Sequence, residues 1–131
     1  MILLLDVNVL MALAHEGHVD HRRVSRWYAS LQAPGTQLAT CSITELGFVR
    51  VSVQAGLEES VPEAVDTLTG MVASSRLPFL RIADDLGAAD LPAHVKGPKQ
   101  VTDGHLLALA RRHKGSLVTL DHGIPGGVTI P

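Results

Sequence analysis

Four acidic residues stand at positions where open α/β proteins gather ligand-binding groups. Asp6 and Asp121 directly follow short apolar runs of the kind that form buried strands. Glu45 and Asp103 fall in the first turns of predicted helices. Because parallel strands end, and the helices after them begin, at one edge of a sheet, all four carboxylates can converge there.

Carboxylate oxygens with water are the ligands that Mg²⁺ and Mn²⁺ prefer in proteins. Such an ion lowers the pKa of a bound water and stabilises the charge of a phosphoryl transition state. Asn8, two residues after Asp6, can orient a carboxylate or a water. The sequence therefore predicts a site for a divalent cation at this edge of the sheet.

Each acid also has a structural alternative, and the alternatives differ in strength. Glu45 and Asp103 would each favour a helix dipole from the first turn. Asp121, before His122 and Gly123, can be a turn residue. Asp6 has no routine structural role at the end of a buried run. Their common placement at one edge favours a site over three separate structural explanations.

The rest of the chain must supply the elements that position these acids. Predicted strands cover residues 2–5, 37–39, 79–82, 117–120 and 128–130, and predicted helices cover 8–14, 19–31, 42–54, 62–74, 85–91 and 103–113. Asn8, Ser42 and Thr102 are the expected N-caps, with Glu45 completing a capping box on Ser42. Strands that alternate with helices predict a three-layer α/β/α domain over residues 1–131, with a central, mostly parallel sheet.

Composition narrows the class of protein further. The chain has 131 residues, of which 46% are hydrophobic and 18% charged, so it is expected to be globular. Aromatic residues are only 3%, and Trp27 and the others are expected to pack in the core rather than stack on nucleobases. The chain has one cysteine and no apolar run of membrane-spanning length, which predicts a cytoplasmic protein that does not associate with a membrane.

The order and spacing of four segments resemble a PIN-domain nuclease, and more closely the VapC-type toxins of bacterial toxin–antitoxin pairs. The resemblance covers essentially the whole chain, and residues 99–110 are similar to a toxin subgroup abundant in actinobacteria. The segments that carry it are Leu4–Leu10, Thr44–Phe48, Val101–Asp103 and Val118–Asp121.

This resemblance implies a metal-dependent endoribonuclease that uses Mg²⁺ or Mn²⁺ and the acidic quartet. Asp6, Asp103 and Asp121 would hold the metal, and Glu45 would act through water or orient the nucleophile. It also implies a homodimer and a cognate antitoxin whose tail occupies the active-site groove. Substrate-contacting or orienting roles are assigned to Asn8, Arg50, Lys99, Thr102 and His105.

Two departures from the family pattern concern local geometry. Family members often carry an aromatic residue shortly after the fourth acid, where this chain has His122, Gly123 and Ile124. Gly104 is a helix-weakening choice beside Asp103.

Other histidines and basic residues have a simpler expected role. His15, His18 and His21 fit no zinc spacing, so a solvated polar loop is expected there. Three arginines between residues 22 and 26 are expected to solubilise their helix.

Several other functions remain open at this point. One is a PIN-fold nuclease of RNA processing outside a toxin pair, and another is a non-catalytic metal-binding module. A phosphatase would need a second aspartate where Asn8 stands. A receiver domain would need a phosphoacceptor aspartate near mid-chain, where only Glu58, Glu59 and Glu63 occur.

Overall fold

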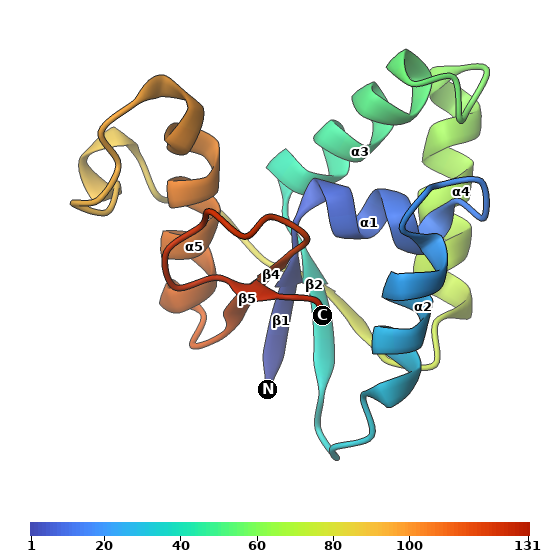
Figure 1. Ribbon diagram of the computed structural model, residues 1–131, viewed down its shortest axis with the longest axis horizontal. Helices are drawn as coiled ribbons and strands as arrows, with labels where there is room; N and C mark the ends of the chain where they lie inside the picture. The colour runs from blue at the N-terminus through green and yellow to red at the C-terminus, as the bar shows by residue number, and fades with distance from the viewer.

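A five-stranded parallel sheet forms the centre of the molecule. The computed structural model describes residues 1–131 (Figure 1). The strands lie in the order β3-β2-β1-β4-β5, and every neighbouring pair is parallel. Their bounds are β1 Ile2–Leu5, β2 Gln37–Thr40, β3 Phe79–Arg81, β4 Ser116–Thr119 and β5 Val128–Thr129. All five carboxyl ends therefore point to one edge of the sheet, as the sequence predicted.

Five α-helices cover the two faces of this sheet. In Figure 1, α5 lies on one side of the sheet and α1 to α4 lie on the other. Their bounds are α1 Val7–Ala14, α2 His21–Ser30, α3 Ser42–Gln54, α4 Val61–Ser74 and α5 Val101–Arg112. The predicted three-layer α/β/α arrangement is confirmed, and the sheet is wholly parallel. No helix is both long enough and apolar enough to cross a membrane.

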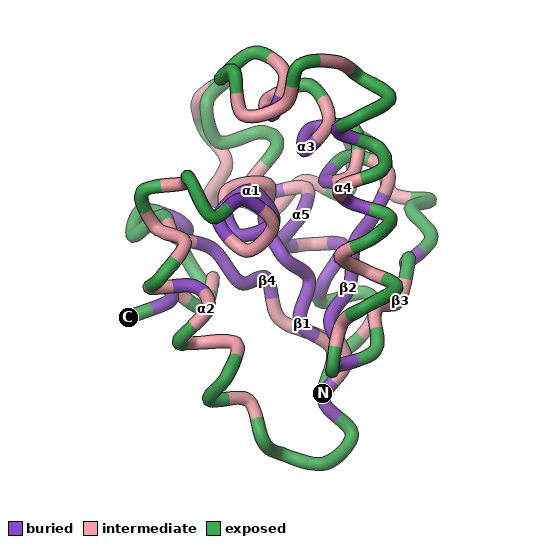
Figure 2. Tube along the Cα trace, turned by 90° about the vertical axis from the view of Figure 1, so that its right-hand side faces the viewer, coloured by how far each residue is buried: buried purple, intermediate pink, exposed green.

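The core divides into two aliphatic layers because side chains alternate along each strand. Leu3 and Leu5 of β1 pack with the layer under α1 to α4, which includes Val24 and Phe48. Leu4 packs on the opposite face with the leucines of α5. Figure 2 shows this buried band running along the strands, with exposed segments around it. A strand buried on both faces explains why Ile2–Leu5 is uniformly apolar.

The helices α1 and α3 approach each other closely at Gly47. A Cβ atom built on this residue would lie 2.7 Å from Cγ2 of Val7. Any side chain at position 47 would force Val7 to shift. The first turn of α1 therefore packs directly on the backbone of α3 near the carboxyl edge of the sheet.

The predicted N-caps are wrong by one or two residues. Asp6, not Asn8, caps α1, since its Oδ1 accepts a hydrogen bond from the Val7 amide at 2.8 Å. Cys41 rather than Ser42 precedes α3. The chain passes from strand to helix with almost no loop, so each cap lies at the strand's own end. Asn8 is consequently free for another role.

The acid-bearing ends of α3 and α5 are also built differently from the prediction. Thr44, not Glu45, closes the capping interaction of α3, through a bond from the Cys41 amide to its Oγ1 at 3.0 Å. Thr102 lies inside α5, because a 3₁₀ turn at Pro98–Gln100 leads directly into that helix. The carboxylate of Glu45 is therefore not used as a cap.

The predicted helix over residues 85–91 is wrong. Only a 3₁₀ turn at Ala88–Asp90 forms there. Gly87 and Pro92 flank it, and a segment this short cannot offset the cost of helix nucleation. The segment instead runs as an irregular connection from β3 to α5.

Gly104 allows this connection to pack against the first turn of α5. A Cβ atom at this position would lie 2.3 Å from Cγ2 of Val95 and 3.5 Å from Cδ of Pro92. The glycine weakens the helix by about 1 kcal/mol relative to alanine. It gives the close contact that positions the neighbouring Asp103.

We expect Gly104→Ala to lower the free energy of unfolding, by about 1 kcal/mol, in urea denaturation. Overpacking against Val95 costs ~1–3 kcal/mol, which exceeds the gain in helix propensity. Gly70→Ala in α4 is the matched control, because nothing lies within 4 Å of its added Cβ. That variant should be more stable than wild type by ~0.5–1 kcal/mol. Equal stabilisation by both substitutions would contradict the packing role of Gly104.

Candidate active site

Asp6 is a buried carboxylate at the junction of β1 and α1. It is 6% exposed. Its Oδ1 accepts from the Val7 amide, and its Oδ2 accepts from the hydroxyl of Thr119 at 2.8 Å. These two bonds fix the orientation of the carboxylate at the carboxyl edge of the sheet. An aspartate ending a buried strand is thus held by donors from two separate elements.

Thr119 links the ends of β1 and β4, and sequence reasoning missed it. Its buried hydroxyl donates to Asp6 and accepts from the Asp121 amide at 3.0 Å. The position of both acids therefore depends on one side chain. One sequence feature indicates such a role: Thr119 is a hydroxyl residue at the end of a predicted buried strand, two positions before Asp121.

Asn8 ties the first turn of α1 to the end of β4. Its Oδ1 accepts from the Leu120 amide at 3.2 Å, and its Nδ2 lies 3.5 Å from Oγ1 of Thr119. The amide side chain thus supports the strand end from which Asp121 projects. Asn8 thus acts on the chain segment that carries Asp121 and forms no hydrogen bond with a carboxylate itself.

Three of the four predicted acids share one cleft, here called the acidic cleft. Asp6 and Asp121 follow the carboxyl ends of β1 and β4, and Asp103 projects from the first turn of α5. The cleft has a volume of about 330 Å³. Its walls are formed by Asp6, Val7, Asn8, Met11, His18, Val51, Ala55, Leu57, Asp103 and Asp121. The topology therefore brings together the acids that the sequence assigned to the metal.

Burial and mutual repulsion disfavour negative charge in the acidic cleft. Burial raises the pKa of Asp6, and the charge of Asp121 adds to this, while hydrogen bonds from Thr119 and Val7 oppose it. Burial also raises the pKa of Asp103, as do the charges of Asp6 and Asp121. No lysine or arginine lines the cleft. A bound cation would relieve this excess of negative charge.

The donor set of the acidic cleft fits a hard divalent cation. The carboxylates of Asp6, Asp103 and Asp121 supply oxygen atoms, which hard cations prefer. No three histidine, cysteine or acidic side chains lie close enough to form a complete ligand shell. Mg²⁺ commonly retains several waters and uses one or two carboxylates directly, so an open arrangement suits it.

Glu45 lies beside the acidic cleft but does not line it. Its carboxylate accepts from Oγ1 of Thr40 at 2.5 Å and lies 3.8 Å from Nε of Arg81. It is therefore already partnered by a hydroxyl and a guanidinium. The structure separates this acid from the other three. In its predicted role, Glu45 would have to act on the metal through a water molecule from outside the cleft.

Four of the five residues predicted to contact or orient the substrate lie outside the acidic cleft, and only Asn8 lines it. Arg50 is exposed and bonds Gln54 at 3.2 Å on α3. Lys99 is exposed in the 3₁₀ turn before α5. Thr102 and His105 line a separate hollow of about 260 Å³, where His105 pairs with Asp84. The structure does not bring these four residues to the acids.

His18 lines the acidic cleft, although the sequence predicted only a solvated loop for it. Its Nδ1 accepts from the Asp20 amide at 3.0 Å, so the neutral ring carries its proton on Nε2. This leaves a hydrogen-bond donor in a cleft whose charged residues are all acidic. Sequence spacing gave no signal for it, because the loop geometry decides which histidine faces the cleft.

The prediction of a solvated loop is also wrong for His15. This residue is 7% exposed and stacks on Phe48 with ring centroids 5.3 Å apart. Its Nε2 lies 3.0 Å from Oγ of Ser52. Burial lowers its pKa, which favours a neutral ring. His15 therefore packs α1 against α3 behind the cleft.

Comparison with known proteins identifies the family. The profile of the PIN domain matches residues 3–125. This chain belongs to the PIN-domain family. Two relatives from Mycobacterium tuberculosis (strain ATCC 25618 / H37Rv) place it among the VapC ribonucleases. Ribonuclease VapC38 is 43% identical over 92% of this chain and 86% of the relative, and Ribonuclease VapC29 is 40% identical over 95% and 89%.

Two solved structures share the fold seen here. Mycobacterium tuberculosis VapC20, described as a toxin that cleaves the sarcin–ricin loop, superposes with a TM-score of 0.66 at 16% identity. The match covers 94% of this chain and 92% of VapC20. A toxin–antitoxin complex from Klebsiella pneumoniae gives a TM-score of 0.58 at 24% identity, over 98% of this PIN-domain chain and 97% of that one.

The raised pKa of Asp103 predicts how the stability of the metal-free protein depends on pH. Such a carboxyl contributes stability that is complete below its unfolded value of 3.8 and is lost as the pH rises through its folded value. We expect Asp103→Asn in EDTA to raise the free energy of unfolding at pH 7 by ~0.5–2 kcal/mol. This gain should disappear below pH 3.8, as followed by urea denaturation at several pH values.

Asp66→Asn is the control for this measurement, because Asp66 is exposed on α4. It should change the free energy of unfolding by less than about 0.5 kcal/mol at any pH. An Asp103→Asn variant no more stable than wild type at pH 7 would show that repulsion in the cleft is negligible.

Proposed function

We propose that this PIN-domain protein is a Mg²⁺- or Mn²⁺-dependent endoribonuclease and the toxin of a toxin–antitoxin pair. The observation that carries the proposal is the convergence of Asp6, Asp103 and Asp121 in one cleft without a lysine or arginine. The relatives' common name, ribonuclease, supports RNA as the substrate. The buried free thiol of Cys41 fits the reducing environment of the cytoplasm.

Asp6, Asp103 and Asp121 would hold the metal ion, with Asp6 as the fixed member. Its two hydrogen bonds leave it little freedom to rotate, whereas Asp121 is exposed and can adjust. A divalent cation supplies activation of the attacking water and stabilisation of charge on the phosphoryl group when it is bound. Asn8 and Thr119 keep the strand end that carries Asp121 in place.

The remaining walls of the acidic cleft would receive the substrate. Met11, Val51 and Leu57 form an apolar side suited to the non-phosphate parts of a nucleotide. The Nε2–H group of His18 can donate a hydrogen bond to a phosphate oxygen. The chain thus offers one hydrogen-bond donor for a phosphate between the carboxylates and the apolar wall.

The same negative cleft would accept a basic segment of a cognate antitoxin. Such a segment would occupy the place of the metal and the RNA, and its charge would satisfy the same carboxylates. The fold likeness to a toxin that has been solved together with its antitoxin supports this assembly. A homodimer of this chain is part of the same proposal.

We expect Asp6→Asn and Asp103→Asn each to lower cleavage of a structured RNA by about 100-fold or more. EDTA should abolish cleavage by wild type, and Mn²⁺ or Mg²⁺ should restore it. Gel analysis of internally cut RNA measures the activity. Thermal unfolding with and without Mn²⁺ measures the binding, because an ion that binds only the folded state raises the Tm.

Asp66→Asn is the matched control, since it removes one exposed carboxylate that does not line the acidic cleft. It should keep both the activity and the Mn²⁺-induced rise in Tm. Full metal-dependent cleavage by Asp103→Asn would rule out the proposed site. A Tm that Mn²⁺ raises equally in Asp103→Asn and wild type would show that the metal binds elsewhere.

We expect Glu45→Gln to reduce cleavage less than Asp103→Asn does, by about 10-fold. Glu45 is bonded to Thr40 and paired with Arg81, so it acts on the site from an outer position. The same cleavage assay and the same Mn²⁺ titration apply. A loss in Glu45→Gln as large as that in Asp103→Asn would mean that Glu45 swings into the cleft and binds the ion directly.

A further inference from the structure

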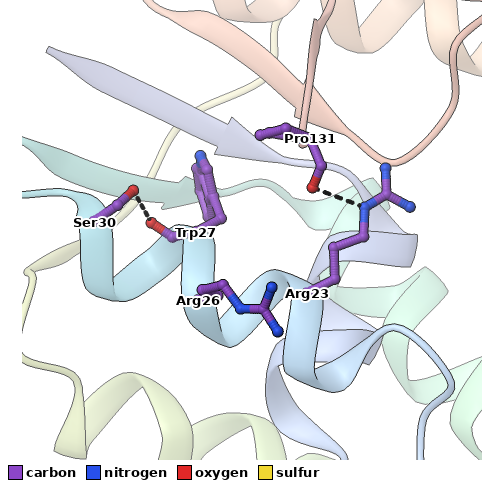
Figure 3. Close-up of a pocket in the computed structure, with 5 residues that line it drawn as sticks. All are labelled: Arg23, Arg26, Trp27, Ser30 and Pro131. Atoms are coloured by element: carbon purple, nitrogen blue, oxygen red, sulfur yellow. Dashed lines mark hydrogen bonds between the residues drawn. The ribbon is translucent and has the colours of Figure 1, made fainter.

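A second hollow lies between α2 and the last residues of the chain. It has a volume of about 220 Å³ and is lined by Arg23, Arg26, Trp27, Ser30 and Pro131 (Figure 3). It shares no residue with the acidic cleft. Its walls are basic and aromatic, whereas those of the cleft are acidic and aliphatic. We call this hollow the Arg26–Trp27 pocket.

Arg23 has a structural role in this pocket. Its Nε donates to the Pro131 carbonyl at 3.1 Å, and its Nη2 donates to the Ile130 carbonyl. Its Nη1 lies 3.6 Å from Asp20. Arg23 therefore fastens the end of the chain to α2, and its charge is largely compensated.

Arg26 and Trp27 have no such partners. Arg26 is exposed and forms neither an ion pair nor a hydrogen bond within the chain, and its guanidinium extends from the helix in Figure 3. The whole of α2 contains no acidic residue. Trp27 packs partly on the core, but its indole makes no hydrogen bond and stands between Ser30 and Pro131 (Figure 3). An unpaired cation and a partly buried indole thus line the same hollow.

The wall of the Arg26–Trp27 pocket at Pro131 lies two residues beyond the carboxyl end of β5. Thr129 of β5 pairs with Thr119, and the Ile130 amide donates to the Thr119 carbonyl at 3.0 Å. Thr119 is also the residue that holds Asp6. The two residues after β5 therefore lead from the edge that carries the acids to the pocket wall at Pro131.

We propose that the Arg26–Trp27 pocket binds one nucleotide of single-stranded RNA that extends from the acidic cleft. A base would stack on Trp27, and a neighbouring phosphate would pair with Arg26. The indole and the guanidinium in one hollow correspond to the base and the phosphate of one nucleotide unit of an RNA strand. This inference rests on the proposed ribonuclease function and gives it a substrate-binding subsite.

This role changes two of the expectations from sequence. Trp27 was expected only to pack in the core, and the arginines of α2 only to solubilise it. Aromatic residues are scarce in this chain, but a stacking site for one base needs only one of them. An acidic peptide would satisfy Arg26 but would leave the indole face unused, so RNA is favoured.

The test uses the intrinsic fluorescence of Trp27, which is the single tryptophan of the chain. A 12-nucleotide single-stranded RNA is titrated into the full-length protein in EDTA, where cleavage is prevented. We expect the RNA to quench Trp27. We also expect Arg26→Glu to weaken the binding by about 10-fold and to reduce its dependence on salt.

Arg22→Glu is the matched control, because Arg22 is exposed on the same helix and does not line the pocket. It should retain most of the affinity. Trp27→Ala removes core packing, so Trp27→Leu is tested beside it. Binding of both variants is measured with labelled RNA, because neither retains a tryptophan. Both should bind RNA weakly while circular dichroism shows that they remain folded. Equal weakening by Arg22→Glu and Arg26→Glu would overturn the pocket in favour of general charge attraction.

The outcomes separate this inference from the proposed function. Cleavage of RNA by wild type, without any quenching of Trp27, would leave the ribonuclease standing and overturn the subsite. Quenching without cleavage in Mg²⁺ or Mn²⁺ would support the subsite and contradict the proposed activity. Quenching by hexaglutamate but not by RNA would overturn the inference in favour of an acidic peptide.

Discussion

The hydrogen bond from Thr119 to Asp6 is the contact on which the site depends. It joins the end of β4 to the point where β1 becomes α1. The same carboxylate caps α1, so the helix, the two central strands and the acid are fixed by one group. Asp121 is placed through the same threonine. The geometry of the acidic cleft is therefore a direct result of how the centre of the sheet ends.

The arrangement of acids that suits a cation lowers the stability of the metal-free protein. A buried carboxylate with two acidic neighbours is unfavourable in a protein without metal, and burial together with repulsion raises the pKa values of Asp6 and Asp103. The fold tolerates the cost because apolar layers on both faces of β1 hold the strand in place. Sites that must bind a cation commonly retain such unfavourable charge.

Much of this site could be predicted from the sequence because topology alone places it. An acid directly after a buried strand, or in the first turn of the following helix, must lie at the carboxyl edge of a parallel sheet. That rule predicts that Asp6, Asp103 and Asp121 lie together, and the structure has all three in one cleft. It failed to separate Glu45 from them, because the direction of a side chain within a helical turn depends on partners such as Thr40 and Arg81.

Other features depended on contacts that no local pattern contains. Asparagine is a good N-cap, so the sequence predicts Asn8 as the cap of α1. The helix begins directly after the strand, however, and Asp6 therefore occupies the cap position. Thr119 was overlooked, since its importance comes from a residue 113 positions away. His15 and His18 were grouped as one polar loop, but one is buried against Phe48 and the other lines the cleft.

The contact between Gly47 and Val7 has a consequence for which substitutions the acidic cleft can accept. A Cβ atom on residue 47 would lie 2.7 Å from Cγ2 of Val7, so the valine would have to shift. Val7 lines the cleft, and its amide donates to the carboxylate of Asp6. The identity of residue 47 is therefore tied to the orientation of that carboxylate, although residue 47 does not itself line the cleft.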